Sequence, residues 1–208
     1  MSIASLLEAV RIDYLDDSVA PYLWSDAAIT RHINEAVKEA CLRAPLITRS
    51  YAISLAIDKA VYELDPSVRS IMRIDGLTQH TESEMVHYFG SEWRNRTGVP
   101  KFYIRRGNKI TLSPVPDAIG TLSVETTNVP DDDFELDDDI NPIYHDALLF
   151  WVAYKCYMFP DQDTYNPVKA RDYLAQFDDA FGVKHSAKYD AVRQNLPKDA
   201  RLRSHRMV

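Results

Sequence analysis

The apolar residues of this sequence are spaced for helices near both ends of the chain and for strands in between. From Ile3 to Tyr14, and again from Ile29 to Ala40, they recur at every third or fourth position, which is the period of one helix face. From Tyr51 to Ile57 they alternate with small or polar residues, as in a strand with one buried face. The pattern predicts an α+β fold, in which helices from both termini form a bundle that carries a central antiparallel β insertion.

The first helical segment is predicted within residues 1–48. Ser25 stands directly before the second periodic run, where its hydroxyl can cap the first turn of a helix. Pro45 cannot continue a helix and therefore closes the segment. We expect two helices here, joined by the residues that precede Ser25.

The β insertion is predicted over residues 49–130. Its strongest signal is a hairpin, because apolar residues alternate before and after Gly107-Asn108, a pair typical of two-residue turns. Three further short strands are expected at 61–64, 70–74 and 122–126.

One short helix is predicted to interrupt the β insertion. Thr81 and Glu84 have the spacing of a capping box, in which each side chain satisfies a backbone N–H of the first helical turn. Gly90 is placed to end this helix.

Two Asn-Pro pairs predict the starts of two closing helices within residues 142–195. Asn141-Pro142 and Asn166-Pro167 each put a capping side chain before a proline at the first helical position. Residues 196–208 contain a proline, few large apolar side chains and several arginines. Such a composition predicts a flexible basic tail that awaits a partner.

Residues 131–141 are predicted to form an acidic loop with seven carboxylates between Asp131 and Asp139. Hard cations favour such oxygen density, but the glycine and spacing of an EF-hand are missing, so a solvated loop is the preferred interpretation. Phe134 and Leu136 are apolar residues within this loop. They are candidate anchors, which either pin the loop to its own domain or dock it on a neighbouring chain with a basic surface.

The first closing helix is rich in aromatic residues between Tyr144 and Phe159. A helix that is apolar around most of its circumference is typical of a bundle core. The alternative is a cradle for a nucleobase or a peptide. Core packing is favoured because no basic stripe, which a nucleic-acid site needs for the phosphates, lies beside the aromatic residues.

The sequence contains no recognisable catalytic or cofactor-binding motif, and we predict neither an enzyme nor a cofactor. His80, Glu84 and His87 could share one helix face and hold a metal ion. A solvated helix face is the preferred interpretation, because His80 precedes the expected cap at Thr81 and so falls outside the helix. No metal site is therefore predicted.

Composition narrows the class of protein further. The chain has 208 residues, of which 46% are apolar, enough for one well-formed core.

Cys41 and Cys156 lie far apart and form no C-x-x-C pair, which disfavours a disulfide framework or a zinc site. The first residues lack the basic region of a signal peptide, and the apolar run 147–159 is too short to span a membrane. We expect a soluble protein that is not secreted.

Charge is divided unevenly along the chain. The formal net charge is −7, which disfavours a general nucleic-acid binder because phosphate binding needs clustered Lys and Arg. From Lys184 onward, however, seven basic residues stand against two acidic ones. A basic segment on an acidic body can seek nucleic acid, an acidic groove on a partner, or a neighbouring copy.

Four short stretches resemble the podovirus-type head-to-tail adaptor family, which includes the tail tubular A proteins and related tail accessory factors. The likeness runs from about Trp24 to Phe181. The stretches are Leu23-Trp24-Ser25-Asp26 with Ile33-Asn34-Glu35-Ala36, Gly98 to Tyr103, Ile110 to Asp117, and Asp139 to Leu148.

This resemblance implies a structural role without catalysis. Twelve copies would form a ring between the portal protein and the tail nozzle protein, at the head-to-tail junction of the virion, after synthesis in the host cytoplasm. DNA would pass through the channel without specific binding, and no membrane would be involved. We expect the free subunit to remain monomeric until a template orders its flexible segments.

The resemblance also implies partner-binding roles for the basic tail and for the acidic loop. Because the C-terminal segment of such adaptors extends along the portal, the tail would dock there. Its candidate contacts are Leu196, Lys198, Arg201, Leu202, Arg203 and Arg206. Phe134 and Leu136 would meet a neighbouring subunit or the nozzle.

Two alternatives remain open from the sequence. One is another virion protein, such as a head-completion factor or a minor tail component. The other is a small enzyme with a pocket built from Tyr144, His145 and Asp146 or from the region of His80 to His87, although neither group includes a recognisable nucleophile.

Overall fold

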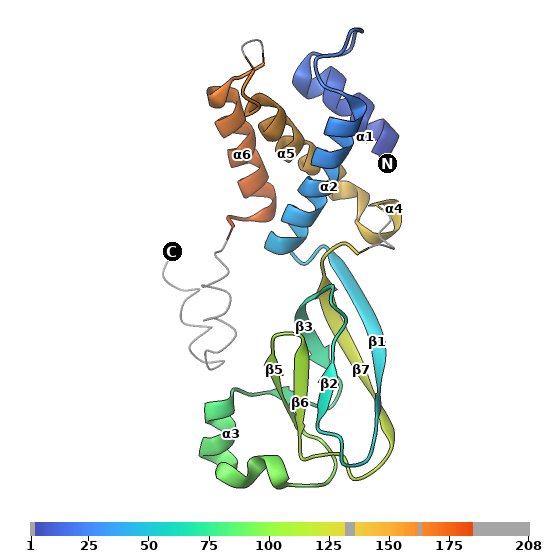
Figure 1. Ribbon diagram of the computed structural model, residues 1–208, viewed down its shortest axis with the longest axis vertical. Helices are drawn as coiled ribbons and strands as arrows, with labels where there is room; N and C mark the ends of the chain where they lie inside the picture. The colour runs from blue at the N-terminus through green and yellow to red at the C-terminus, as the bar shows by residue number, and fades with distance from the viewer. Residues whose placement is uncertain (1–2, 132–135, 162–163, 185–208) are drawn as a thin grey trace. The chain divides into compact units, whose positions relative to one another are not determined.

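The computed structural model describes residues 3–131, 136–161 and 164–184 of the chain (Figure 1). The chain divides into two compact units. Residues up to Thr48 and from Asn128 to Lys184 form one, the helical unit, and Arg49–Thr127 form the other, the β unit. Most helical residues lie in the helical unit and most strand residues in the β unit, which confirms the predicted α+β class.

The helical unit is built from segments that lie far apart in the sequence. Helix α5 packs against both α2 and α6, and α1 contacts α2 and α5. Its elements are α1 (Ile3–Ala9), η1 (Val10–Leu15), α2 (Asp26–Arg43), α4 (Leu136–Asp139), η3 (Pro142–Tyr144), α5 (His145–Tyr157) and α6 (Pro167–Phe181).

The predicted helix starts are confirmed at two caps and shifted at a third. The Ser25 hydroxyl accepts a hydrogen bond from the N–H of Ala28 at 3.3 Å, and the Asn166 side chain accepts from Lys169 at 3.1 Å. Asn141 instead caps the short 3-10 turn η3 through the N–H of Ile143, and α5 begins after it. Each cap satisfies a backbone donor that the helix itself leaves free.

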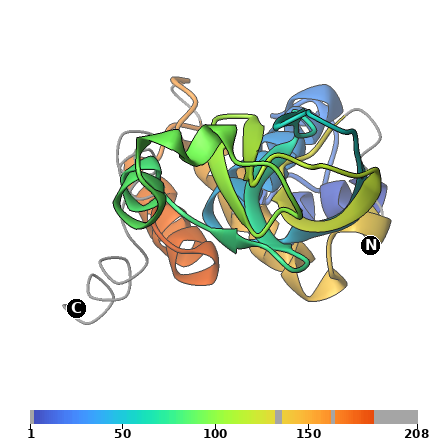
Figure 2. The same ribbon diagram turned by 90° about the horizontal axis from the view of Figure 1, so that it is seen from below.

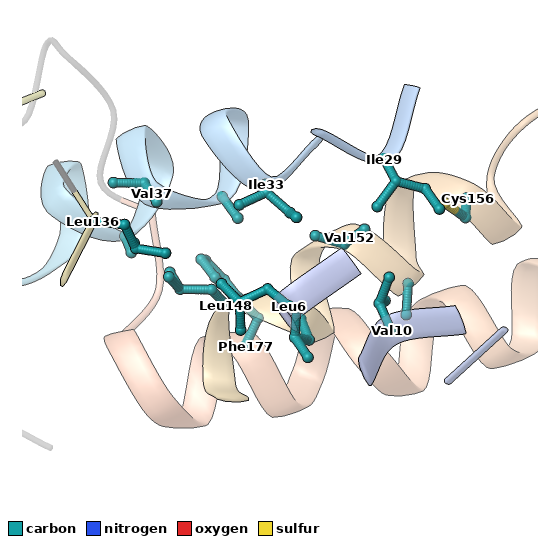
Figure 3. Packing of buried hydrophobic residues seen from close by; sticks show 14 of the residues in the cluster. Leu6, Val10, Ile29, Ile33, Val37, Leu136, Leu148, Val152, Cys156 and Phe177 are labelled. Carbon is teal, nitrogen blue, oxygen red and sulfur yellow. The ribbon is translucent and has the colours of Figure 1, made fainter. Parts of the chain in front are cut away.

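One apolar core holds these helices together (Figure 3). The predicted stripe of α2 faces inward at Ile29, Ile33 and Val37. Leu148 and Val152 of α5 lie opposite it, as Figure 3 shows. Because these side chains are almost fully removed from water, each contributes roughly 1.5–3 kcal/mol of transfer free energy.

The aromatic residues of α5 serve core packing, as predicted. Phe150, Trp151 and Tyr154 pack against the core cluster. The rings of Trp151 and Phe177 lie 5.2 Å apart, and those of Tyr157 and Tyr173 are stacked at 6.0 Å. The aromatic character of α5 is therefore used to join it to α6.

The first helix departs from the regular pattern that its apolar spacing predicts. After Ala9 the α-helix widens into the π-helix η1, which ends at Asp16 in the left-handed conformation, with φ of 52°. An inserted wide turn displaces every later side chain around the helix axis. It brings Arg11, a charged residue, into the buried interior.

The β unit contains two small sheets and one helix. A three-stranded sheet has the order β1-β7-β3, and a four-stranded sheet has the order β2-β6-β5-β4. The elements are β1 (Ile47–Leu55), β2 (Val61–Glu63), β3 (Val68–Ile74), β4 (Thr78–Gln79), α3 (Glu82–Phe89), η2 (Ser91–Asn95), β5 (Phe102–Arg106), β6 (Lys109–Ser113) and β7 (Gly120–Asn128). Strands β4 and β5 pair in parallel, which the predicted antiparallel insertion did not include.

The predicted hairpin is confirmed. Strands β5 and β6 pair antiparallel, and Arg106 faces Lys109 across a two-residue turn. Gly107 occupies the first turn position with φ of +58°, a conformation that side chains other than glycine rarely adopt.

The capping box of α3 is confirmed as well. The Thr81 hydroxyl accepts from the N–H of Glu84, and the Glu84 carboxylate accepts from the N–H of Thr81 at 2.6 Å. Met85 of this helix is buried against Trp93 and Ile104. Helix α3 lies on the side of the β unit away from β1 and β7 (Figure 1 and Figure 2).

Candidate partner-binding surfaces

Of the anchors predicted in the acidic loop, Leu136 lies in the described part of the chain and Phe134 lies outside it. Leu136 starts the single helical turn α4 and is only 6% exposed, within the core of the helical unit. Figure 3 shows its side chain near Val37. Of the two roles considered for Leu136, this burial supports an anchor of the loop to its own domain.

The predicted tail contacts, Leu196 to Arg206, also lie outside the described residues, and side-chain contacts hold the last residues before Lys184. Arg43, at the end of α2, donates through Nε to Glu39 Oε1 at 3.1 Å and through Nη1 to the carbonyl oxygen of Gly182 at 3.0 Å. It also pairs with Asp178 of α6. Lys184 Nζ lies 2.8 Å from Glu39 Oε2.

These contacts, which we call the C-terminal clamp, join residues about 140 positions apart in the sequence. The guanidinium of Arg43 also lies over the ring of Phe177, 4.8 Å from its centroid. The clamp therefore fixes the end of α6 beside the end of α2. The described part of the chain ends there, at Lys184.

At the other end of the helical unit, a buried ion pair orders the connection from η1 to α2. Arg11 pairs with Asp17, and each of these residues is only 4% exposed. Asp17 also accepts from the N–H of Leu23 at 2.8 Å, and Arg11 donates to the carbonyl oxygen of Trp24 at 2.6 Å. The side chain of Tyr22 lies over the guanidinium, with 4.0 Å from Arg11 Cζ to the ring centroid.

The neighbouring connection from α5 to α6 is tied to the same end. Tyr157 donates from its hydroxyl to the carbonyl oxygen of Tyr14 at 3.0 Å, and the N–H of Asn166 donates to the carbonyl oxygen of Tyr157 at 2.9 Å. The rings of Trp24 and Tyr157 meet edge to face at 6.2 Å. Both connections therefore belong to one surface.

This surface carries exposed apolar side chains that the helical core does not use. We call it the apolar end. It comprises Val19, Tyr22, Leu23, Met158, Phe159, Tyr165 and Val168. Large apolar residues within connections that also hold Pro21 and Pro160 are a sequence signal for such a surface, but the sequence does not reveal that the two connections adjoin.

A groove of about 280 Å³ opens within the apolar end. Leu23, Trp24 and Phe159 supply most of its apolar wall, and Arg31 and Asp161 are among its polar lining. A wider hollow adjoins it between Met158 and Tyr165. Anchor side chains at protein interfaces enter apolar pockets of this kind, which makes the groove a candidate partner-binding site.

The histidine region considered for a metal forms an aromatic cluster instead. His80 lies before the helix, and its ring packs edge to face with Phe102 at 5.1 Å and with Tyr88 at 6.0 Å. Its Nδ1 lies 3.6 Å from Glu84 Oε2. In the described ranges, no three His, Cys, Asp or Glu residues are grouped to hold a metal ion.

Of the residues considered for an enzyme pocket, Tyr144, His145 and Asp146 line neither the groove nor the wider hollow of the apolar end. His145 is buried and its Nε2 lies 3.1 Å from the carbonyl oxygen of Ile140, whereas Asp146 of the same helix is exposed. Burial raises the pKa of the Cys156 thiol to about 12, so this cysteine is a poor nucleophile at neutral pH. In the described part of the chain, no helix combines the length and apolar character needed to cross a membrane.

Comparison with known proteins identifies the family. No curated protein matches the chain. A solved structure, described as the neck of an empty GTA particle computed with C6 symmetry, is similar over 90% of this chain and 92% of that chain, with 14% sequence identity and a TM-score of 0.32.

A family model described as SU10 adaptor protein matches residues 1–201, nearly the whole chain. This match confirms the resemblance to a head-to-tail adaptor that the short sequence stretches indicate, and it supports a structural role as an adaptor. The chain belongs to the SU10 adaptor protein family.

Proposed function

We propose that this chain forms a ring of twelve copies at the head-to-tail junction of the virion, between the portal protein and the tail nozzle protein. The family match over residues 1–201 carries the proposal. Two features of the chain support it. The exposed apolar side chains of the apolar end offer a surface for another protein of the junction. Charge is divided between segments of the chain, which supplies the unlike faces that ring contacts require.

The charge of the helical unit suits a channel for DNA. The residues up to Thr48 and from Asn128 to Lys184 contain 20 Asp and Glu against 8 Lys and Arg. An acidic wall releases no counterions from DNA, so it offers little hold on a passing duplex. We propose that DNA passes without specific binding. A ring whose bore is lined mainly by Lys and Arg would contradict this.

Partner contacts are proposed at two places outside the described residues. The basic tail docks on the portal through Leu196, Lys198, Arg201, Leu202, Arg203 and Arg206. Phe134, in the acidic loop, meets a neighbouring subunit or the nozzle. Since ordering a free segment costs conformational entropy, the subunit remains monomeric until the portal orders it.

The test is direct. Purified protein is incubated with portal-bearing heads that lack this protein, and the particles are imaged by electron microscopy. A twelve-fold collar beneath the portal is the expected result. Protein that stays unbound at micromolar concentration, while the portal remains bare, would contradict the proposal.

A further inference from the structure

We propose that the apolar end is a preformed docking site for a tail-side protein whose contact surface is apolar and rimmed by Lys and Arg. This inference rests on the proposed function, because it assigns a surface to one of the two partners of a junction subunit. It concerns described residues throughout. Its occupant is the nozzle side of the neck and not a second copy of this chain.

The first support is that the apolar end is held rigid at a cost in stability. Burying Arg11 and Asp17 removes two charges from water, a desolvation penalty that a well-packed apolar pair avoids. The pair fixes the backbone of Leu23 and Trp24. A backbone that is already ordered loses less entropy when a partner binds, so the arrangement favours docking.

The second support is the groove itself. Leu23 is 60% exposed and Phe159 is 56% exposed, on opposite connections, and both line the groove. Binding energy at protein interfaces concentrates in apolar side chains that enter such a pocket.

The third support is charge, which selects the occupant. Asp13 and Asp16 are exposed on the segment that leads into the apolar end, whereas Arg31 and Asp161 in the lining of the groove carry opposite charges. Acidic residues also outnumber basic ones in the helical unit. A partner with Lys and Arg around its apolar centre is therefore attracted. A second apolar end would bring like charges together, which disfavours an end-to-end pair of copies.

Position separates this site from the proposed portal contact. The described part of the chain ends at the C-terminal clamp, whereas the groove lies where α6 begins. Helix α6 has 15 residues, so the two places are about 22 Å apart along it. A subunit that links two partners needs one surface for each. Since the tail is proposed to dock on the portal, the apolar end remains for the tail side.

The test compares two double variants of the full-length protein. Leu23→Ser with Phe159→Ser removes the anchors of the apolar end. Ile143→Ser with Val183→Ser is the matched control, since these residues of the same unit are 76% and 61% exposed and do not line the groove. Each protein is loaded on portal-bearing heads, collars are counted by electron microscopy, and binding of purified nozzle protein to the collars is titrated.

The apolar-end variant is expected to form collars as the wild type does and to bind the nozzle at least about tenfold more weakly, with the control within about twofold. Higher salt should weaken the wild-type contact. Unchanged nozzle binding would overturn the inference. So would loss of collars, because the occupant would then be the portal or a neighbouring copy. Wild-type protein that makes no collar at all would instead contradict the proposed function.

Discussion

Arg11 and Asp17 form a buried ion pair across the turn that ends the first helical segment. The π-helix places the guanidinium inside the unit, and the left-handed Asp16 turns the chain so that the next carboxylate meets it. The pair also satisfies three backbone groups of residues 23 and 24, two N–H groups and one carbonyl oxygen. A charge network in the interior thus shapes the surface above it.

Breaking this pair should be costly. Arg11→Met leaves the buried Asp17 carboxylate without its charged partner, so it should lower the free energy of unfolding by about 3–5 kcal/mol. Asp17→Asn should cost less, because Asp26 Oδ1 still lies 2.6 Å from Arg11 Nη2. The double variant should cost less than the sum of the two. Urea unfolding followed by circular dichroism measures both. Arg31→Met is the control and should change stability by less than about 1 kcal/mol, because Arg31 is exposed and lies 3.9 Å from Glu35. Equal effects at both arginines would argue against a buried network.

Truncation of a core leucine should destabilise the helical unit. Leu148 is fully buried between α2 and the segments that pack on α5, so Leu148→Ala should cost about 2–5 kcal/mol through lost burial and a residual cavity. Val183→Ala, at an exposed position, should cost less than about 0.5 kcal/mol. Thermal and urea unfolding of the three proteins decide this. A small effect at Leu148 would mean that the core relaxes around the lost atoms.

The free energy of unfolding of the β unit should depend on pH through the carboxyl group of Glu84. Burial alone raises the pKa of this carboxyl, but hydrogen bonds from the N–H and hydroxyl of Thr81 outweigh it and hold the pKa below 4.5. The folded state therefore binds its proton less readily than the unfolded state. The stabilisation is present above pH 4.5 and is lost as the pH falls through the folded pKa. Wild-type protein should thus lose more stability than Glu84→Gln between pH 5 and pH 3 in urea titrations. Parallel losses would assign the effect elsewhere.

The two cysteines should be unreactive in the folded protein. Cys41 and Cys156 are both buried and reduced, and the raised pKa of Cys156 leaves almost no thiolate at pH 8. A colorimetric thiol reagent should therefore label neither within minutes in buffer and both in 6 M guanidinium chloride. Rapid labelling of the native protein would show that the helical unit opens readily at the end of α5.

Removal of the basic tail should separate folding from portal attachment. Truncation after Asn195 removes no residue of the described core, so the melting temperature should be unchanged within a few degrees. Attachment to portal-bearing heads should be lost. Centrifugation of heads with bound protein measures attachment, and full-length protein is the control. Attachment that survives truncation would show that the tail plays no part in it.

Local signals predicted much of the fold because the groups that decide it are close in sequence. Ser25, Asn166 and the Thr81–Glu84 box each act within one helical turn, and the Gly107 hairpin needs only its own turn residues. Alternation and helical spacing likewise report a face that is buried in any context. These features were therefore visible in the sequence.

The contacts that shape the apolar end and the C-terminal clamp could not be predicted from local sequence signals. The Arg11–Asp17 pair depends on the π-helix from Val10 to Leu15. The residue types of this segment do not predict a π-helix. The apolar end joins Leu23 to Phe159 across more than 130 positions, and the C-terminal clamp joins Glu39 to Lys184. Such neighbours exist only once the helices have packed. Leu136, conspicuous in the acidic loop, belongs to the core for the same reason.

The strands that carry the chain into and out of the β unit, β1 and β7, are hydrogen-bonded neighbours. The insertion therefore begins and ends on adjacent strands. The path of the chain through the helical unit does not depend on the length of the insertion. The β unit can be lengthened, shortened or replaced without changing the order of helices in the helical unit. Related chains can accordingly keep the same helical unit while the surface formed by the strands and α3 varies.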